Sequence, residues 1–296
     1  MDRRFARRQN QRTAPVRNGD GVTEIGGTAT AADGTRLSVI DQGSGEPFLL
    51  IPGLGYAAWS FTRQLGPLSS NARVLAMDNR GAGRSDKPPG PYSIAQMADD
   101  AFAVLSQRGA IPAHVVGTSM GGYVALTLAI RHPAAVRSLV LVATTSGGKG
   151  SLGVPNETLR VWGEAATLGV EGFARASMPS SFAPGWVEAH PDEFEQLLAL
   201  RLSDPTPTDA WRAQFDACAV FLRKGLALGA ITQPVTIIHG TADRVVPYQN
   251  AAHLARGLPQ ANVVTLEGAG HLCWIEQADA VNTIILDSIK LAESPS

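Results

Sequence analysis

Cysteine is scarce in this sequence, long apolar runs are missing, and neither sign of charge predominates. The 296 residues include 2 cysteines, so neither a disulfide framework nor a cysteine-rich metal site is expected. No apolar run is long enough to cross a bilayer, so we expect no membrane partner. With a formal net charge of -1, no electrostatic argument favours nucleic acid as a partner.

A chain of this length can bury a substantial core. Its 296 residues, 44% of them hydrophobic, suit one large α/β domain or a core with an insertion. The low cysteine content is typical of a reducing, cytoplasmic setting. Residues 1–18 are rich in arginine but lack the apolar segment of a signal peptide, so we interpret them as a flexible basic tail.

Apolar runs that predict β-strands alternate with helical patterns along most of the chain. From Phe48 to Ala143 this alternation is typical of a mostly parallel, doubly wound sheet with helices on both faces. We expect about eight strands, near residues 24–29, 36–42, 47–51, 73–77, 114–116, 136–143, 235–238 and 262–266.

The alternation stops between residues 146 and 231, where only helical patterns occur. We therefore interpret 19–145 and 232–296 as an α/β core and 146–231 as a helical cap inserted after the sixth strand. Most aromatic residues of this insertion are expected to fill its own core, while a few are available to line a substrate cavity. The large apolar residues in question are Trp162, Phe173, Met178, Phe182, Trp186, Phe194, Trp211, Phe215 and Phe221.

The segment around Ser119 carries the clearest chemical signal. The apolar run His114–Val116 leads into Gly117–Gly121, which matches G-x-S-x-G, and a helix-forming stretch follows. Such a strand–turn–helix places the serine hydroxyl in the open, above the carboxyl edge of a sheet. The alternative is a glycine-rich turn with a chance serine, and the strand–turn–helix context favours a nucleophile.

Two backbone N–H groups are candidates for an oxyanion hole. The Met120 N–H lies at a helix N-terminus, where backbone donors have no partner within the helix. The Leu54 N–H belongs to a glycine-containing loop directly after the buried strand Pro47–Ile51. The alternative is that Leu54 simply belongs to an ordinary strand-to-helix loop. This interpretation is compatible with a role of its N–H as an oxyanion donor.

A serine hydroxyl needs a base, and the base needs an orienting acid. Asp243 follows the predicted strand at 235–238, although aspartate is also common simply as a turn residue. Among the 6 histidines, His271 lies on a glycine-rich loop after the last strand, in the expected chain order serine, acid, histidine. His239, close to Asp243 in the sequence, is the main alternative to His271 as the base. Asp78 and Arg80 follow another strand, and we expect them to hold loops rather than to react.

Taken together, these segments resemble the α/β-hydrolase superfamily over roughly residues 21–292. Within it, the chain is similar to capped esterases and lactonases, such as 3-oxoadipate enol-lactonases, and to cofactor-free haloperoxidase-type esterases. One departure is Pro52 before Gly53, where the family often has histidine. The resemblance rests on Gly53–Gly55, Asp78–Ser85, Gly117–Gly122, Gly240–Pro247 and Gly268–His271.

The resemblance implies an α/β-hydrolase fold and a serine hydrolase acting on a small-molecule ester or lactone. Ser119 disfavours the branches of this fold that use an aspartate nucleophile, the epoxide hydrolases and haloalkane dehalogenases. The alternatives are C–C bond hydrolysis of a vinylogous diketone, haloperoxidase-type perhydrolysis, and a ligand receptor on a hydrolase scaffold. The proposed chemistry requires no metal and no organic cofactor.

Overall fold

A nine-stranded sheet forms the centre of the computed structural model, which describes residues 16–17 and 23–293. The strand order is β1-β2-β3-β5-β4-β6-β7-β8-β9. Neighbouring strands from β5 to β9 run parallel, whereas the pairs β1–β2, β2–β3 and β3–β5 are antiparallel. The strands are β1 (Val16–Arg17), β2 (Thr23–Thr30), β3 (Arg36–Gly43), β4 (Pro47–Ile51), β5 (Arg73–Met77), β6 (Ala113–Thr118), β7 (Val136–Val142), β8 (Val235–Gly240) and β9 (Asn262–Leu266).

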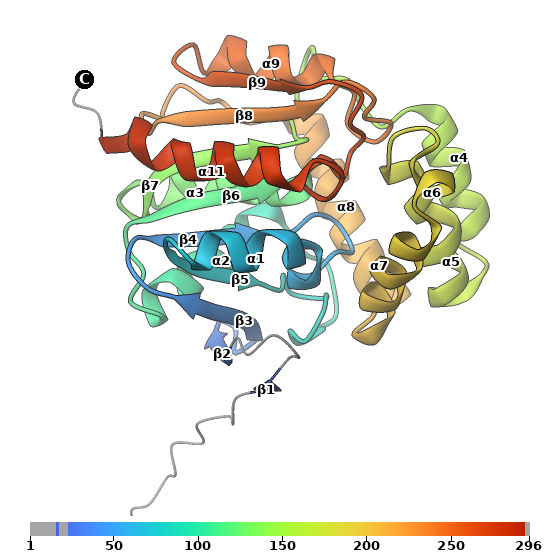
Figure 1. The fold of residues 1–296 in the computed structure, drawn as a ribbon, viewed down its shortest axis with the longest axis horizontal. Coiled ribbons are helices and arrows are strands. Elements are labelled where there is room, and N and C mark those ends of the chain that lie inside the picture. Colours follow the sequence, from blue (N-terminus) through green and yellow to red (C-terminus); the bar gives the residue numbers. More distant parts are fainter. Residues whose placement is uncertain (1–15, 18–22, 294–296) are drawn as a thin grey trace, which may run out of the picture.

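Helices cover both faces of this sheet, and a separate group of helices lies beyond one end of it (Figure 1). The helices of the core are η1 (Ala58–Phe61), α1 (Thr62–Ser69), α2 (Ile94–Gln107), α3 (Met120–Arg131), η2 (Pro133–Ala135), α9 (Gln249–Gly257), α10 (Cys273–Glu276) and α11 (Ala278–Glu293). Those between β7 and β8 are α4 (Asn156–Ala165), α5 (Gly169–Ser177), η3 (Met178–Ser181), α6 (Trp186–Ala189), α7 (Pro191–Ser203) and α8 (Thr208–Lys224).

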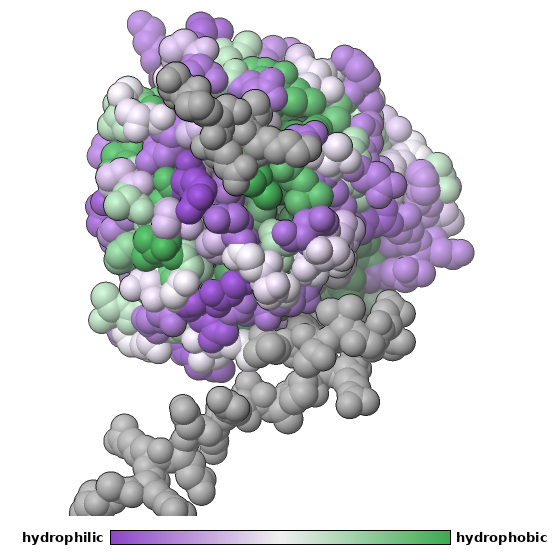
Figure 2. Space-filling view, turned by 60° about the vertical axis from the view of Figure 1, so that its left-hand side comes forward, coloured by the Kyte–Doolittle hydropathy of each residue, from purple (hydrophilic) through white to green (hydrophobic). Residues whose placement is uncertain are grey.

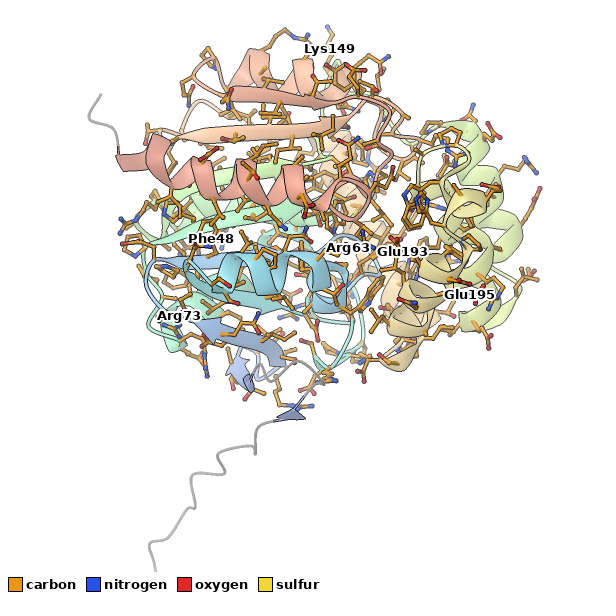
Figure 3. All side chains as sticks on the ribbon, in the orientation of Figure 1. Phe48, Arg63, Arg73, Lys149, Glu193 and Glu195 are labelled. Atoms are coloured by element: carbon orange, nitrogen blue, oxygen red, sulfur yellow. The ribbon has the colours of Figure 1, made fainter. Side chains whose placement is uncertain are left out.

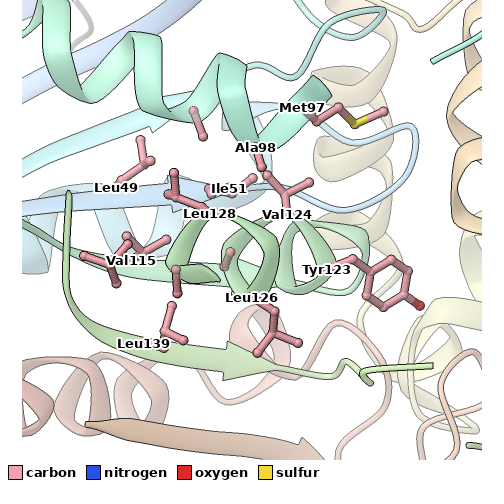
Figure 4. Packing of buried hydrophobic residues seen from close by; sticks show 14 of the residues in the cluster. Leu49, Ile51, Met97, Ala98, Val115, Tyr123, Val124, Leu126, Leu128 and Leu139 are labelled. Atoms are coloured by element: carbon pink, nitrogen blue, oxygen red, sulfur yellow. The ribbon is translucent and has the colours of Figure 1, made fainter. Parts of the chain in front are cut away.

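The two faces of the sheet are filled by alternating side chains of the same strands, as a pleated strand requires. In β4, Leu49 and Ile51 join the apolar cluster formed with α2 and α3. Phe48 and Leu50 join the cluster formed with α1 and α11. Figure 4 shows the first cluster, in which helix α3 lies against the strands and contacts α2. Because β4 is buried on both faces, it reads as a continuous apolar run.

The predicted α/β-hydrolase architecture is confirmed, with all eight expected strands present and the short β1 added. We call the helical group between β7 and β8 the cap. The helical pattern near residues 274–292 predicts one last helix, and this prediction is wrong: the helix is broken at Gln277, which has a non-helical ψ of 52° and whose side-chain amide donates to the Glu267 carbonyl. The short α6 was not predicted.

The glycine-rich loop after β5 has the structural role expected of it. Asp78 accepts a hydrogen bond of 2.7 Å from the Ala58 N–H and thereby joins two loops. Arg80 is only 2% exposed and forms ion pairs with Asp100 at 2.6 Å and with Asp33 at 2.8 Å. A buried guanidinium with two carboxylate partners is a compensated charge, so this loop is fixed against the turn between β2 and β3 and against α2.

Apolar packing and several polar contacts attach the cap to the core. On one side, the guanidinium of Arg63 in α1 forms an ion pair with Glu193 in α7, and Figure 3 shows the two side chains meeting at the junction. Elsewhere, Arg244 donates hydrogen bonds of 3.0 Å to the carbonyls of Pro179 and Phe182. These contacts place the cap helices over the carboxyl ends of the parallel strands.

Most of the tail predicted at residues 1–18 lies outside the described residues. Its two described residues, Val16 and Arg17, form β1 against β2. Within the described ranges, no helix is both long enough and apolar enough to cross a membrane. The face of the molecule in Figure 2 mixes hydrophilic residues with small groups of hydrophobic ones.

Candidate active site

Ser119 lies on the sharp turn between β6 and α3. Its backbone has a φ of 53° and a ψ of -119°, a region that non-glycine residues rarely adopt. Two hydrogen bonds hold this conformation: the Ser119 N–H donates to Val142 at 2.9 Å, and the Thr144 hydroxyl donates to the Ser119 carbonyl at 2.7 Å. The strained turn is therefore fixed by the neighbouring strand.

Two glycines make this turn sterically possible. A Cβ on Gly117 would overlap the carbonyl of Gly121, and a Cβ on Gly121 would overlap the carbonyl of Ile51 at the end of β4. The close approach of α3 to β4 thus depends on positions without side chains, as the spacing G-x-S-x-G predicts.

Asp243 and His271 meet at the carboxyl end of the sheet. Oδ2 of Asp243 lies 2.9 Å from Nδ1 of His271, and both side chains are almost fully buried. The other oxygen, Oδ1, accepts hydrogen bonds of 2.8 Å from the N–H groups of Val245 and Val246. These bonds fix the carboxylate, so its orientation toward His271 does not depend on the histidine alone.

His239, the competing histidine, also approaches Asp243. Its Nε2 lies 3.2 Å from Asp243 Oδ2 and donates to the Val246 carbonyl at 2.8 Å. The His239 side chain is completely buried, and it does not line the cavity that His271 shares with Ser119. Both histidines thus approach one carboxylate, but only His271 lines the same cavity as Ser119.

The environment of Asp243 keeps its carboxyl group ionised. Burial alone raises the pKa of Asp243, but the neighbouring His271 and the hydrogen bonds from His239 and His271 outweigh this effect and lower the pKa from 3.8 to about 2. At neutral pH the site thus contains a fixed negative charge against Nδ1 of His271.

A cavity of about 290 Å³, which we call the main cavity, opens between the core and the cap. Ser119, His271, Leu54 and Met120 all line it on the core side. The Ser119 hydroxyl makes no hydrogen bond to any described residue, and such bonds often tighten only when a substrate binds. The cap aromatics that line the main cavity are Trp162, Phe173, Trp211 and Phe215.

Both candidate oxyanion donors are available. In the part of the chain that the structure describes, neither the Leu54 N–H nor the Met120 N–H donates a hydrogen bond. The loop carrying Leu54 is held from two sides, because Asn79 donates to the Pro52 carbonyl at 3.0 Å and Gln214 accepts from the Gly55 N–H at 2.9 Å. Free donors on a fixed backbone are what an oxyanion hole needs.

Glu276 connects the histidine loop to the cap and was not identified from the sequence. Its Oε1 accepts from the N–H of Gly270 at 3.2 Å and from the N–H of Ala183 at 3.1 Å. Beside it, the Leu272 N–H donates to the Ser181 carbonyl at 2.8 Å. Burial raises the pKa of Glu276. Nothing in the sequence distinguishes this glutamate from a surface residue of a helix.

Sequence reasoning also missed Arg201, a buried arginine of α7 that lines the main cavity. A signal was present, because Arg201 continues the apolar spacing of Phe194, Leu197 and Leu198 on one face of the helix. In residues 16–17 and 23–293, no group of three His, Cys, Asp or Glu side chains is arranged to hold a metal ion.

The chain belongs to the alpha/beta hydrolase fold family, whose model matches residues 46–278. Among curated proteins, it is 31% identical to a 2-hydroxymuconate semialdehyde hydrolase of Pseudomonas putida, over 92% of this chain and 96% of that one. Among solved structures, it matches a thermophilic esterase from Thermogutta terrifontis with a TM-score of 0.77 and 27% identity, over 92% of this chain and 100% of the esterase.

An enol-lactonase from Burkholderia xenovorans LB400 is similarly close, with a TM-score of 0.78 and 26% identity over 89% of this chain and 100% of that chain. The resemblance to lactonases of this superfamily is thus confirmed. The relatives nevertheless act on different bonds. Membership of the family therefore supports a hydrolase, and the bond that it cleaves has to be inferred from the site.

Proposed function

We propose that this protein hydrolyses a carboxylic ester or a lactone through an acyl-enzyme. Ser119 is the nucleophile, His271 the general base and Asp243 the orienting acid. One observation carries the proposal: His271, held 2.9 Å from Asp243, lines the same cavity as a serine on a strained strand–helix turn. An esterase and an enol-lactonase with the same fold support the choice of bond.

In the first step, the neutral His271 donates its Nδ1–H to Asp243, which leaves the Nε2 lone pair to accept the Ser119 proton. The serine oxygen bonds to the carbonyl carbon, and the carbonyl electron pair moves to its oxygen. The N–H groups of Leu54 and Met120 donate to this oxyanion, and one such donor contributes roughly a hundred- to thousand-fold in rate.

In the second step, the tetrahedral intermediate expels the alcohol, which takes the proton from His271. Water then gives a proton to His271 while its oxygen attacks the acyl carbon. Collapse of this second intermediate returns the proton to Ser119 and releases the acid. A lactone follows the same path, except that its alcohol stays attached to the acyl group.

Hydrolysis of a C–C bond is the second candidate. The observation in its favour is the 31% identity to a 2-hydroxymuconate semialdehyde hydrolase. Its products differ from those of an ester, because a carbon acid leaves instead of an alcohol. Product analysis with a vinylogous diketone and with an ester of similar size separates the two reactions.

The Ser119→Ala variant tests the proposal directly. We expect the wild-type protein to hydrolyse some members of a panel of aryl esters and lactones, and the variant to lose about 10⁴-fold or more in kcat. Ser203→Ala, at an exposed position of α7, is the matched control and should keep full activity. Turnover that persists in Ser119→Ala would refute the assignment.

Labelling by a fluorophosphonate separates an enzyme from a receptor built on the same scaffold. A serine activated by His271 and an oxyanion hole should react, and the label should be absent from Ser119→Ala. If the wild-type protein is not labelled, this result favours a ligand receptor over an enzyme.

A further inference from the structure

One segment of the cap, residues 179–183, binds two of the three loops that carry the proposed triad. It includes the end of η3 and leads toward α6, and we call it the 179–183 segment. Ser181 is only 5% exposed and Phe182 is fully buried, so the segment is tightly packed. Figure 1 shows the loops that follow β8 and β9 next to the cap helices. Covering the cavity does not by itself require a cap segment to bind these loops.

The acid loop binds the segment through Arg244, the residue directly after Asp243. Nη2 of Arg244 donates hydrogen bonds of 3.0 Å to the carbonyls of Pro179 and Phe182. The carbonyl of Arg244 in turn accepts a hydrogen bond of 2.6 Å from the Thr158 hydroxyl in α4. Arg244 forms no ion pair with any described residue, so cap carbonyls are the partners of its guanidinium. The residue next to the orienting acid is thus bound to the cap.

The histidine loop binds the segment through Glu276. The Gly270 N–H, directly before His271, donates to both carboxylate oxygens of Glu276, at 3.2 and 3.1 Å. Oε1 of the same carboxylate accepts a hydrogen bond of 3.1 Å from the Ala183 N–H. One side chain therefore holds the backbone beside the histidine and the backbone of the cap at the same time.

The histidine loop also packs directly on the cap backbone. A Cβ on Gly270 would lie 2.3 Å from the nitrogen of Ala183, a distance that only a glycine permits. On the other side of the histidine, the Leu272 N–H donates to the Ser181 carbonyl at 2.8 Å. Both neighbours of His271 in the chain therefore contact the 179–183 segment.

We propose that the 179–183 segment of the cap positions the His271 imidazole against Asp243, with Arg244 and Glu276 as positioning residues. If the segment moved, the backbone on both sides of His271 would lose its contacts, and the 2.9 Å pair with Asp243 would no longer be held. A displacement of about 1 Å in a reacting group can cost about a hundred-fold in rate. The inference rests on the proposed function only for the role of His271 as general base.

Glu276→Met tests the inference from the core side, because it removes the acceptor while preserving the length of the side chain. The N–H groups of Gly270 and Ala183 then lose their partner. We expect kcat for an aryl ester to fall by about ten- to a hundred-fold, with KM within about three-fold of the wild type. Glu276→Gln, which keeps one acceptor oxygen, should recover most of the loss.

Glu164→Met, at an exposed position of α4, is the matched control and should keep the wild-type kcat and KM. Thermal unfolding shows whether each variant is folded. If Glu276→Met lowers the unfolding temperature and leaves kcat unchanged, Glu276 only attaches the cap, and the inference is overturned.

Phe182→Leu tests the inference from the cap side, and it carries the test if Glu276→Met does not fold. The Phe182 ring stacks on Trp186 with ring centroids 4.1 Å apart, and it is not among the described residues that line the main cavity. Loosening this packing should lower kcat by about ten-fold and leave KM unchanged. A rise in KM with unchanged kcat would mean that the segment only shapes the cavity, which contradicts the inference.

A double variant tests whether Arg244 and Glu276 act through the same segment. If the loss of one contact already releases the segment, Arg244→Met combined with Glu276→Met should lower kcat by much less than the product of the two single losses. Losses that multiply would show that each residue acts on its own loop, and would overturn the shared role of the cap.

Proton NMR tests the position of His271 without turnover. The Nδ1–H of His271, identified by the loss of its resonance in His271→Gln, should shift or exchange faster with water in Glu276→Met and match the wild type in Glu164→Met. An unchanged resonance in Glu276→Met would overturn the inference, whatever the protein hydrolyses. A changed resonance in a protein that hydrolyses no ester or lactone would support the inference and overturn the proposed function.

Discussion

The two walls of the main cavity are built in different ways. On the core side, Ser119 and His271 follow strands of the sheet; the Ser119 N–H donates to the Val142 carbonyl, and His271 donates to Asp243, so both residues are fixed in place. On the cap side, aromatic rings of α4, α5 and α8 contact one another, and the Arg201 guanidinium has no ion-pair partner among the described residues. The comparison suggests that the core wall performs the reaction and the cap wall selects what enters it.

Asp243→Asn should have the largest effect on the core wall among the changes that preserve its shape. An amide cannot accept the His271 Nδ1–H as a carboxylate does, so the histidine is expected to adopt the wrong tautomer. We expect kcat to fall by about 10⁴-fold, while KM changes little because the cap wall is intact. Steady-state kinetics on an aryl ester measures both quantities, with Asp216→Asn on the exposed face of α8 as the control.

The same variant has a predicted effect on acid stability. The pKa of Asp243 is lowered in the folded state from 3.8 to about 2, so its ionised form adds stability above pH 3.8, and this stability is lost as the pH falls toward 2. The contribution is about 2 kcal/mol. Chemical unfolding between pH 5 and 2 should show this component in the wild type and not in Asp243→Asn; equal pH dependence of the two would contradict it.

Gly121→Ala tests whether the core wall depends on close backbone packing. A Cβ there would overlap the Ile51 carbonyl, so either α3 or β4 must move. We expect a loss of about 3 kcal/mol in the free energy of unfolding, together with a loss of activity. Gly66→Ala is the matched control, because Gly66 is exposed within α1, a Cβ there meets nothing within 4 Å, and alanine should stabilise the helix slightly.

Phe215→Ala tests the cap wall by removing one of the aromatic rings that line the main cavity. Phe215 stacks on Trp211 with ring centroids 5.2 Å apart and lines the main cavity. Removing the ring should raise KM for an apolar ester by about ten-fold through lost apolar contact, with kcat within about two-fold of the wild type. A fall in kcat with unchanged KM would show that the cap wall positions the reacting groups, and would break the comparison.

The core wall could be predicted from the sequence because its geometry is local. The spacing of Gly117, Ser119 and Gly121 already determines a sharp turn, and Asp243 and His271 each directly follow a strand. The choice between His239 and His271 is different, since both approach the same carboxylate and only their direction toward the cavity separates them. That direction is set by the packing of distant segments.

The cap wall could be predicted only as a group of helices. Helix positions follow from periodicity, but the side chains facing the cavity depend on how α4, α5, α7 and α8 pack on one another. Arg201 shows this limit clearly: its spacing after Phe194 marks it as inward-facing, yet only the structure reveals that no carboxylate of residues 16–17 and 23–293 pairs with it. The interruption at Gln277 likewise depends on a contact with Glu267 from another loop.

The smallest expected effect concerns the junction between the two walls. Glu193→Gln removes the charge that pairs with Arg63, whose side chain is 37% exposed against 27% for Glu193. An ion pair so open to solvent contributes little, so we expect the free energy of unfolding to fall by less than about 1 kcal/mol, and less still at high salt. Thermal or urea unfolding at two salt concentrations measures this.

A matched control for the junction is Glu195→Gln, whose partner Arg175 also belongs to the cap. If the partly buried contacts of Glu276 and Arg244 hold the cap in place, the two variants should be equally stable and both should keep the wild-type KM. If KM rises for Glu193→Gln but not for Glu195→Gln, the exposed Arg63–Glu193 pair sets the distance between the two walls. Glu195→Gln also removes one negative charge, but from a pair that lies entirely within the cap.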